Sequence, residues 1–144
     1  KDVVVASRFV DNGKLHGLTG FRLFLSTVAN FFMKTFFYAD GLQEYSCGYR
    51  MYKVSIIKKA IDIYGNNFIE LKSLGFACTL EKVIKLSHIG AKFAEIGFEM
   101  DYRDKKSDSK MNVKKTTIGY IALVFYNYFP FTGWRAKYRK YRDL

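Results

Sequence analysis

The sequence has 144 residues, about the size of one domain, and its hydrophobic fraction of 49% excludes an intrinsically disordered chain. The formal net charge of +11 is large for this length and predicts an anionic partner, which could be a phosphorylated substrate, an acidic lipid or a nucleic acid. Two cysteines without a Cys-x-x-Cys pair, and only two histidines, do not match a structural zinc pattern, and we expect the reduced thiols of a cytosolic protein.

A short apolar run near the start of the chain predicts a strand. Val3 to Ala6 have the pattern of a strand that is covered on both faces, and Asp11-Asn12-Gly13 supplies a turn after it. We therefore expect an inner strand of a mixed sheet.

The segment from Gly20 to Phe37 has a helical pattern and contains no proline. Arg22, Ser26 and Asn30 are spaced by four, and steps of four drift by only about 40° on an α-helix. These side chains therefore form one polar stripe on an otherwise apolar helix. The stripe is either a solvated face or the face that meets a phosphate, and the sequence leaves both interpretations open.

A turn of small residues follows, between aromatic and basic side chains, in the stretch Glu44-Tyr45-Ser46-Cys47-Gly48-Tyr49-Arg50-Met51-Tyr52. Ser46 and Gly48 are small enough to let backbone N–H groups approach an anion, and Arg50 offers a planar pair of donors for a carboxylate or phosphate. We interpret the stretch as a substrate loop. The alternative is a strand of alternating aromatic residues that enters a core.

The middle of the chain alternates between helical and strand patterns. Val54 to Tyr64 predicts an amphipathic helix that ends at Gly65, and Leu80 to Ser87 predicts a short helix. Alternation with a period of two from Lys92 to Met100 predicts a strand. Together with the first strand, these elements predict an α/β fold.

The segment from Thr116 to Phe131 is apolar and aromatic but has only 16 residues, fewer than the ~20 that a membrane-spanning helix needs. It precedes a tail in which aromatic rings alternate with cations, namely Trp134, Arg135, Lys137, Tyr138, Arg139, Lys140 and Arg142. This mixture favours a helix that lies at a lipid headgroup layer. A core helix followed by a solvated basic tail is the alternative.

The order of these motifs resembles the second half of a family 2 glycosyltransferase, of the dolichol-phosphate mannosyltransferase-like type. The motifs are a strand that ends in Ser7-Arg8, the striped helix, the 46–50 loop, a helix with Glu81, a strand with Glu95, and Ser109-Lys110-Met111. The resemblance runs from Asp2 to Met111. It implies that residues 1–112 form the C-terminal half of a nucleotide-diphospho-sugar transferase domain, with a Rossmann-like mixed sheet and flanking helices. Residues 113–144 would be an amphipathic, membrane-associated helix and a basic tail.

The resemblance also implies a reaction, the transfer of a sugar from a nucleotide-sugar donor to a polyprenyl phosphate at the cytosolic face of a membrane. In this family an Asp-x-Asp motif holds Mg²⁺ or Mn²⁺ against the departing diphosphate. The sequence contains no Asp-x-Asp. We therefore expect the donor-binding half and its metal motif to precede Lys1, and we expect this chain alone to bind no metal and to be inactive.

Carried over by resemblance, the acceptor-phosphate residues are Arg8, Arg22 and Ser26, and those of the substrate loop are Ser46, Gly48 and Arg50. Arg103, Ser109 and Lys110 match a flexible loop that closes over the donor pyrophosphate, and Glu81 matches a residue that faces the catalytic cleft. An exposed helical Glu81 that pairs with Lys85, four residues on, is the alternative. The sequence departs from the family at Gly97, where a proline is usual, at Glu44, where aspartate is common, and in a glycine missing before Ser109-Lys110.

Two functions without catalysis stay open. A basic adaptor at a membrane surface and a single-stranded nucleic-acid-binding module would both explain the charge and the aromatic residues. No recognised nucleic-acid motif is present in the sequence, so we expect no nucleic-acid partner.

Overall fold

The computed structural model describes residues 1–17, 20–103 and 112–142. It confirms a mixed α/β fold with a small mixed sheet and helices, whereas membership of the nucleotide-sugar transferase fold stays a prediction. The chain divides into two compact units, unit 1 with Lys1–Tyr52 and Lys92–Ser109, and unit 2 with Lys53–Ala91 and Lys110–Leu144.

Unit 1 contains the strands and one helix: β1 (Val3–Ser7), β2 (Lys14–His16), α1 (Gly20–Phe36), β3 (Arg50–Tyr52), β4 (Phe93–Gly97) and β5 (Glu99–Asp101). The central strand is β1, which pairs antiparallel with β3 and parallel with β4. The predicted inner strand of a mixed sheet is therefore confirmed. Its alternate residues Val3, Val5 and Ser7 are fully buried, whereas the residues between them are half-buried.

The strand predicted from Lys92 to Met100 is broken into β4 and β5. The chain changes partner at Phe98, whose N–H donates to the Ser7 carbonyl over 2.9 Å and whose carbonyl accepts from the Lys14 N–H over 3.2 Å. Beyond that point β5 pairs in parallel with β2. A Cβ at Gly97 would collide with the Asp11 carbonyl, so the turn after β1 requires a glycine here.

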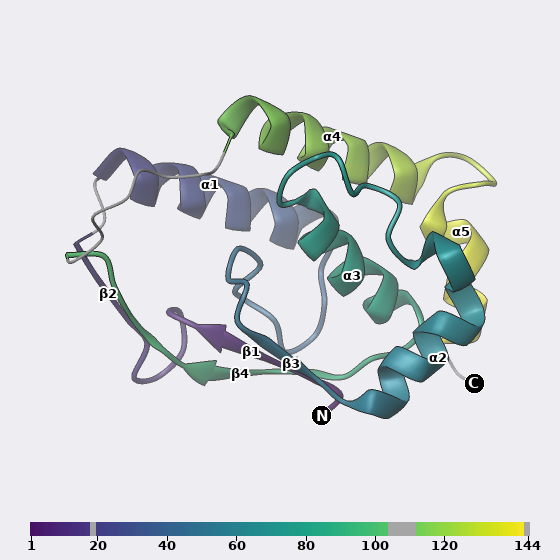
Figure 1. The fold of residues 1–144 in the computed structure, drawn as a ribbon, viewed down its shortest axis with the longest axis horizontal. Helices are drawn as coiled ribbons and strands as arrows, with labels where there is room; N and C mark the ends of the chain where they lie inside the picture. Colours follow the sequence, from purple (N-terminus) through teal and green to yellow (C-terminus); the bar gives the residue numbers. More distant parts are fainter. Residues whose placement is uncertain (18–19, 104–111, 143–144) are drawn as a thin grey trace. The chain divides into compact units, whose positions relative to one another are not determined.

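Helix α1 lies above the strands of unit 1 in Figure 1, and its predicted span is confirmed to within one residue. The loop that follows α1 is fixed by Tyr45, whose hydroxyl accepts from the Ala39 N–H (3.1 Å) and donates to the Phe37 carbonyl (3.0 Å). Burial raises the pKa of Tyr45 to about 12, so this hydroxyl stays protonated. Residues 44–49 continue the loop, and Arg50 begins the short strand β3. The stretch from Glu44 to Tyr52, for which a loop and a strand were the two interpretations, is therefore partly loop and partly strand.

Unit 2 is helical and contains α2 (Val54–Tyr64), η1 (Gly65–Phe68), α3 (Ala77–His88), α4 (Val113–Tyr128), α5 (Trp134–Tyr138) and η2 (Arg139–Tyr141). The predicted bounds of α2 are confirmed, and Gly65 ends the helix with a φ of 54°. Helix α3 is longer than predicted at both ends.

Small residues let α4 approach α3. A Cβ at Gly119 would lie 2.7 Å from the Cβ of Ala77 and 2.9 Å from the Leu74 carbonyl, so the two helices are close at this point. Further along, His88 Nε2 lies 2.6 Å from Asn127 Oδ1. Burial lowers the pKa of His88, which favours the neutral ring, and a neutral ring with its proton on Nε2 donates to the Asn127 side-chain oxygen.

Candidate functional site

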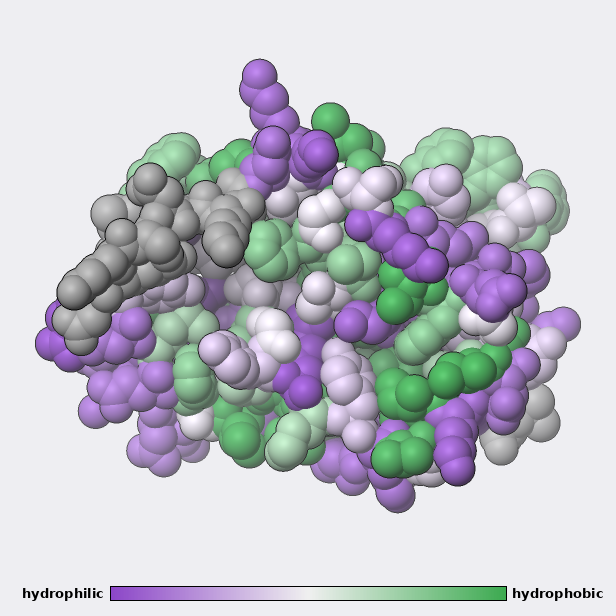
Figure 2. Space-filling view, viewed as in Figure 1, coloured by the Kyte–Doolittle hydropathy of each residue, from purple (hydrophilic) through white to green (hydrophobic). Residues whose placement is uncertain are grey.

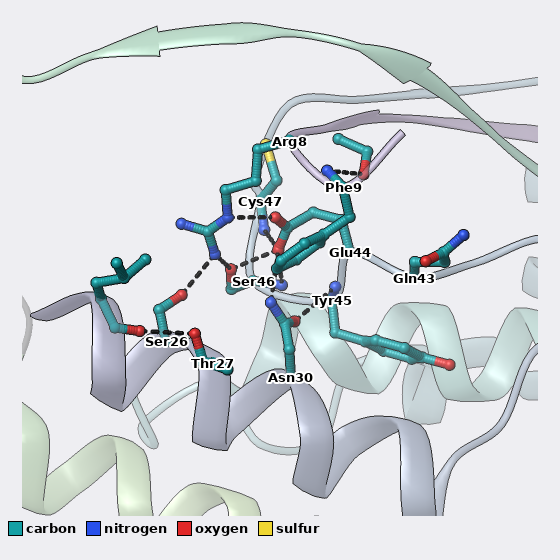
Figure 3. A network of polar contacts seen from close by, with 12 residues as sticks. Arg8, Phe9, Ser26, Thr27, Asn30, Gln43, Glu44, Tyr45, Ser46 and Cys47 are labelled. Carbon is teal, nitrogen blue, oxygen red and sulfur yellow. Dashed lines mark hydrogen bonds and ion pairs between the residues drawn. The ribbon is translucent and has the colours of Figure 1, made fainter. Parts of the chain in front are cut away.

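A partly buried polar cluster in unit 1 gathers around Arg8, the residue that follows β1 (Figure 3). Arg8 Nη2 donates to Ser26 Oγ on α1 over 2.5 Å and to Ser46 Oγ in the 44–49 loop over 2.9 Å. Arg8 Nε forms an ion pair with Glu44 Oε2 at 2.9 Å. Only 8% of the Arg8 side chain and 2% of the Glu44 side chain are exposed.

Glu44 organises the loop as well as neutralising Arg8. Its Oε1 accepts from the Ser46 N–H (2.8 Å), the Ser46 hydroxyl (2.5 Å) and the Cys47 N–H (3.1 Å). The amide of Asn30 donates to the same oxygen over 3.3 Å and accepts from the Tyr45 N–H over 2.9 Å. Because these donors converge on one carboxylate, the loop presents Ser46 toward Arg8 in a defined position.

A second carboxylate supports this loop from β4. Glu95 Oε1 accepts from the backbone N–H groups of Gln43 and Glu44, each over 2.5 Å. Its other oxygen is buried and has no hydrogen-bond partner among the described residues. Arg50 Nη2 donates to the Tyr45 carbonyl over 2.6 Å, so this arginine also holds the loop from β3.

Cys47 lies beside the cluster and is also buried. Burial, the largest cause, raises the pKa of its thiol. The thiol is therefore neutral at physiological pH and is not an activated nucleophile.

The predicted polar stripe on α1 divides between two environments. Ser26 and Asn30 face the cluster, whereas Arg22 is exposed and has no hydrogen bond or ion pair within the described part of the chain. Arg8 Nη1 carries two further N–H groups, and it has no hydrogen bond to any described residue. Gly48 is exposed, and a Cβ there would meet open space.

The predicted pyrophosphate loop is described only at its first residue. Arg103 is exposed and pairs with Asp101 through a contact of 2.5 Å. Hydrogen bonds from Arg103 lower the pKa of Asp101 to about 2. Ser109 and Lys110 lie outside the described residues.

Glu81 belongs to unit 2 and is fully buried on α3. It forms the ion pair with Lys85 that the alternative interpretation proposed, at 2.6 Å, but the pair is buried, since neither side chain is accessible. Glu81 also accepts from the N–H groups of Glu70 (2.8 Å) and Leu71 (2.9 Å). Its place in the catalytic cleft stays a prediction.

Sequence reasoning missed the two carboxylates that organise the cluster. In the sequence, Glu44 is distinguished only as a departure from the family pattern, and Glu95 only as a residue of a predicted strand. A buried acid has no local sequence signature, because its partners come from segments far away along the chain. The spacing of four residues between Ser26 and Asn30 is the local feature of the sequence from which part of the cluster could be predicted.

Unit 1 also contains an open cavity of about 450 Å³. It is lined by residues of the chain start, the end of α1, the 38–43 loop and β4, including Lys34, Tyr38, Gln43 and Glu95.

Among the described residues, no three His, Cys, Asp or Glu side chains are grouped so that they could hold a metal ion.

Comparison of the chain with protein-family models, with curated proteins and with solved structures returned no match.

Proposed function

We propose that the chain is the acceptor-side half of a glycosyltransferase and that the cluster around Arg8 binds the phosphate of a polyprenyl phosphate. One observation carries the proposal. Arg8, Ser26 and Ser46 come from separate motifs that were each assigned to substrate binding. One nitrogen of the Arg8 guanidinium donates to both serine hydroxyls, within 2.9 Å.

The chemistry of the acceptor supports this assignment. A phosphate monoester has its second pKa near 6 and is largely a dianion at neutral pH, so it needs cations more than a general base. Glu44 balances the charge of Arg8, and a dianion therefore requires a second cation. Arg22 precedes Ser26 by one turn of α1 and is accessible, so it can supply that charge.

In a complete enzyme, a donor-binding half would hold the nucleotide sugar and a divalent metal, Mg²⁺ or Mn²⁺, through an Asp-x-Asp motif. The residues of this chain would then orient the acceptor phosphate toward the anomeric carbon at the cytosolic face of a membrane. We expect no sugar transfer from this chain alone.

The first prediction tests the phosphate site. A soluble short-chain polyprenyl phosphate should bind the chain, and Arg22→Ala should weaken binding by roughly ten- to a hundredfold, because a charge-assisted hydrogen bond contributes about 1.5–3 kcal/mol. Arg22→Lys should restore only part of the affinity, since it keeps the charge but loses the planar pair of donors. Isothermal titration calorimetry measures both.

Lys34→Ala is the matched control, because Lys34 is an exposed cation in the last turn of the same helix. The wild-type chain and all variants should bind the corresponding alcohol, which lacks the phosphate, with the same affinity. If Arg22→Ala and Lys34→Ala have equal effects on phosphate binding, the stripe is a solvated helix face and the assignment is wrong.

A further inference from the structure

Helix α4 has one buried face and one apolar face exposed to solvent. Thr116, Gly119, Leu123 and Asn127 are its buried residues. On the opposite side Ile118, Ile121 and Phe125 follow the helical repeat and are 57%, 63% and 60% exposed. Helix α4 therefore packs against the rest of unit 2 through a narrow buried face, while large apolar side chains cover its opposite, exposed face.

The apolar surface continues beyond the end of α4. The ring of Phe129 packs on that of Phe125 with centroids 4.9 Å apart. Figure 2 shows hydrophobic side chains over the end of α4 and the loop that follows it. Phe131, in this loop, is 95% exposed.

The backbone of this loop is strained at Phe131, which has a φ of 64°. A bulky residue with a Cβ rarely adopts this left-handed conformation, and it costs of the order of 1 kcal/mol or more. The turn is closed by a hydrogen bond from the Gly133 N–H to the Phe129 carbonyl (2.9 Å). The loop thus exposes Phe131 to solvent in a strained backbone conformation, and its side chain gains almost no packing within the described chain that would offset the strain.

The charged residues within this part of the chain have one sign. Residues 112–142 contain seven Lys and Arg and no Asp or Glu. Arg135 and Lys137 are exposed on α5, and the Arg135 guanidinium lies 5.4 Å from the centre of the Tyr128 ring. Lys114 and Lys115 are exposed at the other end of α4.

We propose that the α4–α5 surface, formed by Ile118, Ile121, Phe125, Phe129, Phe131, Arg135 and Lys137, docks on the surface of a lipid bilayer that contains anionic lipid. The apolar side chains enter the boundary between headgroups and acyl chains, and the cations pair with acidic headgroups. Within residues 1–17, 20–103 and 112–142, no helix is long and apolar enough to span a membrane. The inference deepens the membrane location in the proposed function, and its test concerns this surface and not the phosphate site.

Two other occupants fit the surface less well. A nucleic acid would match the cations and could stack on the rings, but Ile118 and Ile121 have no aromatic face for a base. A second copy of the chain would bring two surfaces of the same sign together, and like charges that are desolvated in an interface oppose association. A bilayer satisfies both the aliphatic side chains and the cations.

The second prediction is tested by co-sedimentation of the full chain with vesicles of phosphatidylcholine, with or without phosphatidylglycerol. The chain should bind the anionic vesicles more tightly, and high salt should weaken that binding. Phe131→Ser should weaken it by about tenfold or more, the loss expected when a phenylalanine no longer leaves water. Arg135→Ser with Lys137→Ser should remove most of the preference for anionic vesicles, about thirtyfold at about 1 kcal/mol per cation.

Phe76→Ser is the matched control, because Phe76 is a 51% exposed phenylalanine of the same unit outside this surface, at the N-cap of α3. Insertion is also read directly in Phe131→Trp, whose fluorescence should shift to the blue when anionic vesicles are added, whereas the native Trp134 is buried and should change little. The proposal is overturned if Phe131→Ser binds vesicles as Phe76→Ser does. It is equally overturned if the surface variants affect binding of a single-stranded oligonucleotide, or self-association, but not binding to vesicles.

Discussion

Glu44 is the residue on which the Arg8 cluster depends. Both of its oxygens are used, one for the ion pair with Arg8 and the other for four donors from the loop and α1. A buried carboxylate in this position holds the arginine in place and limits the net charge that it can offer to a ligand. In the proposed phosphate site, the affinity for an anion would be set by the balance between the charges of Glu44, Arg8 and Arg22.

The third prediction concerns this balance. Glu44→Gln keeps the shape of the side chain but leaves Arg8 without a buried counter-charge, so the free energy of unfolding should fall by about 3 kcal/mol. Urea denaturation measures the loss. Inorganic phosphate should recover more stability in this variant than in the wild-type chain, since it can pair with the released guanidinium.

Gln43→Ala is the control for that prediction, because Gln43 has an exposed side chain in the same loop and its backbone N–H still reaches Glu95. Its stability should change by no more than about 0.5 kcal/mol. Equal stabilities of the Glu44→Gln and Gln43→Ala variants would show that the ion pair contributes little.

At the scale of elements, Lys85 joins three segments of unit 2. Its ammonium lies on α3 and donates to Glu81 (2.6 Å), to Glu70 (2.7 Å) and to the Asn67 carbonyl of η1. It also lies 4.1 Å from the centre of the Trp134 ring of α5, whose Nε1 donates to Glu70 over 2.8 Å. This cluster attaches α5, and with it the cationic end of the α4–α5 surface, to the helical core.

The fourth prediction is that Lys85→Met lowers the free energy of unfolding by about 3–5 kcal/mol, because it leaves buried carboxylates without their cation. The position of the urea transition, followed by circular dichroism, reports this loss. Lys82→Met, three residues earlier on α3, is the matched control and should change stability by at most about 0.5 kcal/mol. Similar transitions for the two variants would contradict a role for the buried ammonium in holding α5.

At the scale of the whole molecule, the excess of 24 Lys and Arg over 13 Asp and Glu creates repulsion among charges of one sign. This repulsion acts over the Debye length and is screened by salt, whereas the buried pairs of Arg8 and Lys85 are screened much less. The net charge therefore opposes folding most strongly in dilute buffer.

The fifth prediction follows from that difference. The Tm should rise by a few degrees between low and high concentrations of sodium chloride, since about 1 kcal/mol moves the Tm of a domain of this size by about 4 °C. Replacing the exposed Lys58 and Lys72 by Glu should flatten the dependence, because it lowers the net charge. A Tm that falls with salt would mean that surface ion pairs outweigh the repulsion.

The sequence by itself determined the elements whose signals are local. The buried strand β1, the helix α1 and the bounds of α2 follow from hydrophobic periodicity and from Gly65, because these depend only on neighbouring residues. The same periodicity identified Ser26 and Asn30 as one face of a helix. The exposed apolar segment at α4 was also visible as composition.

Only the tertiary structure decided which polar side chains meet. The pairing of Arg8 with Glu44, the support of their loop by Glu95 and the burial of Lys85 join residues that are 15 to more than 50 positions apart. The break between β4 and β5 likewise arises because the turn at Asp11 passes against Gly97. Such contacts depend on how the chain returns to itself, and the stabilisation of a buried charge depends on partners that no local pattern of the sequence contains.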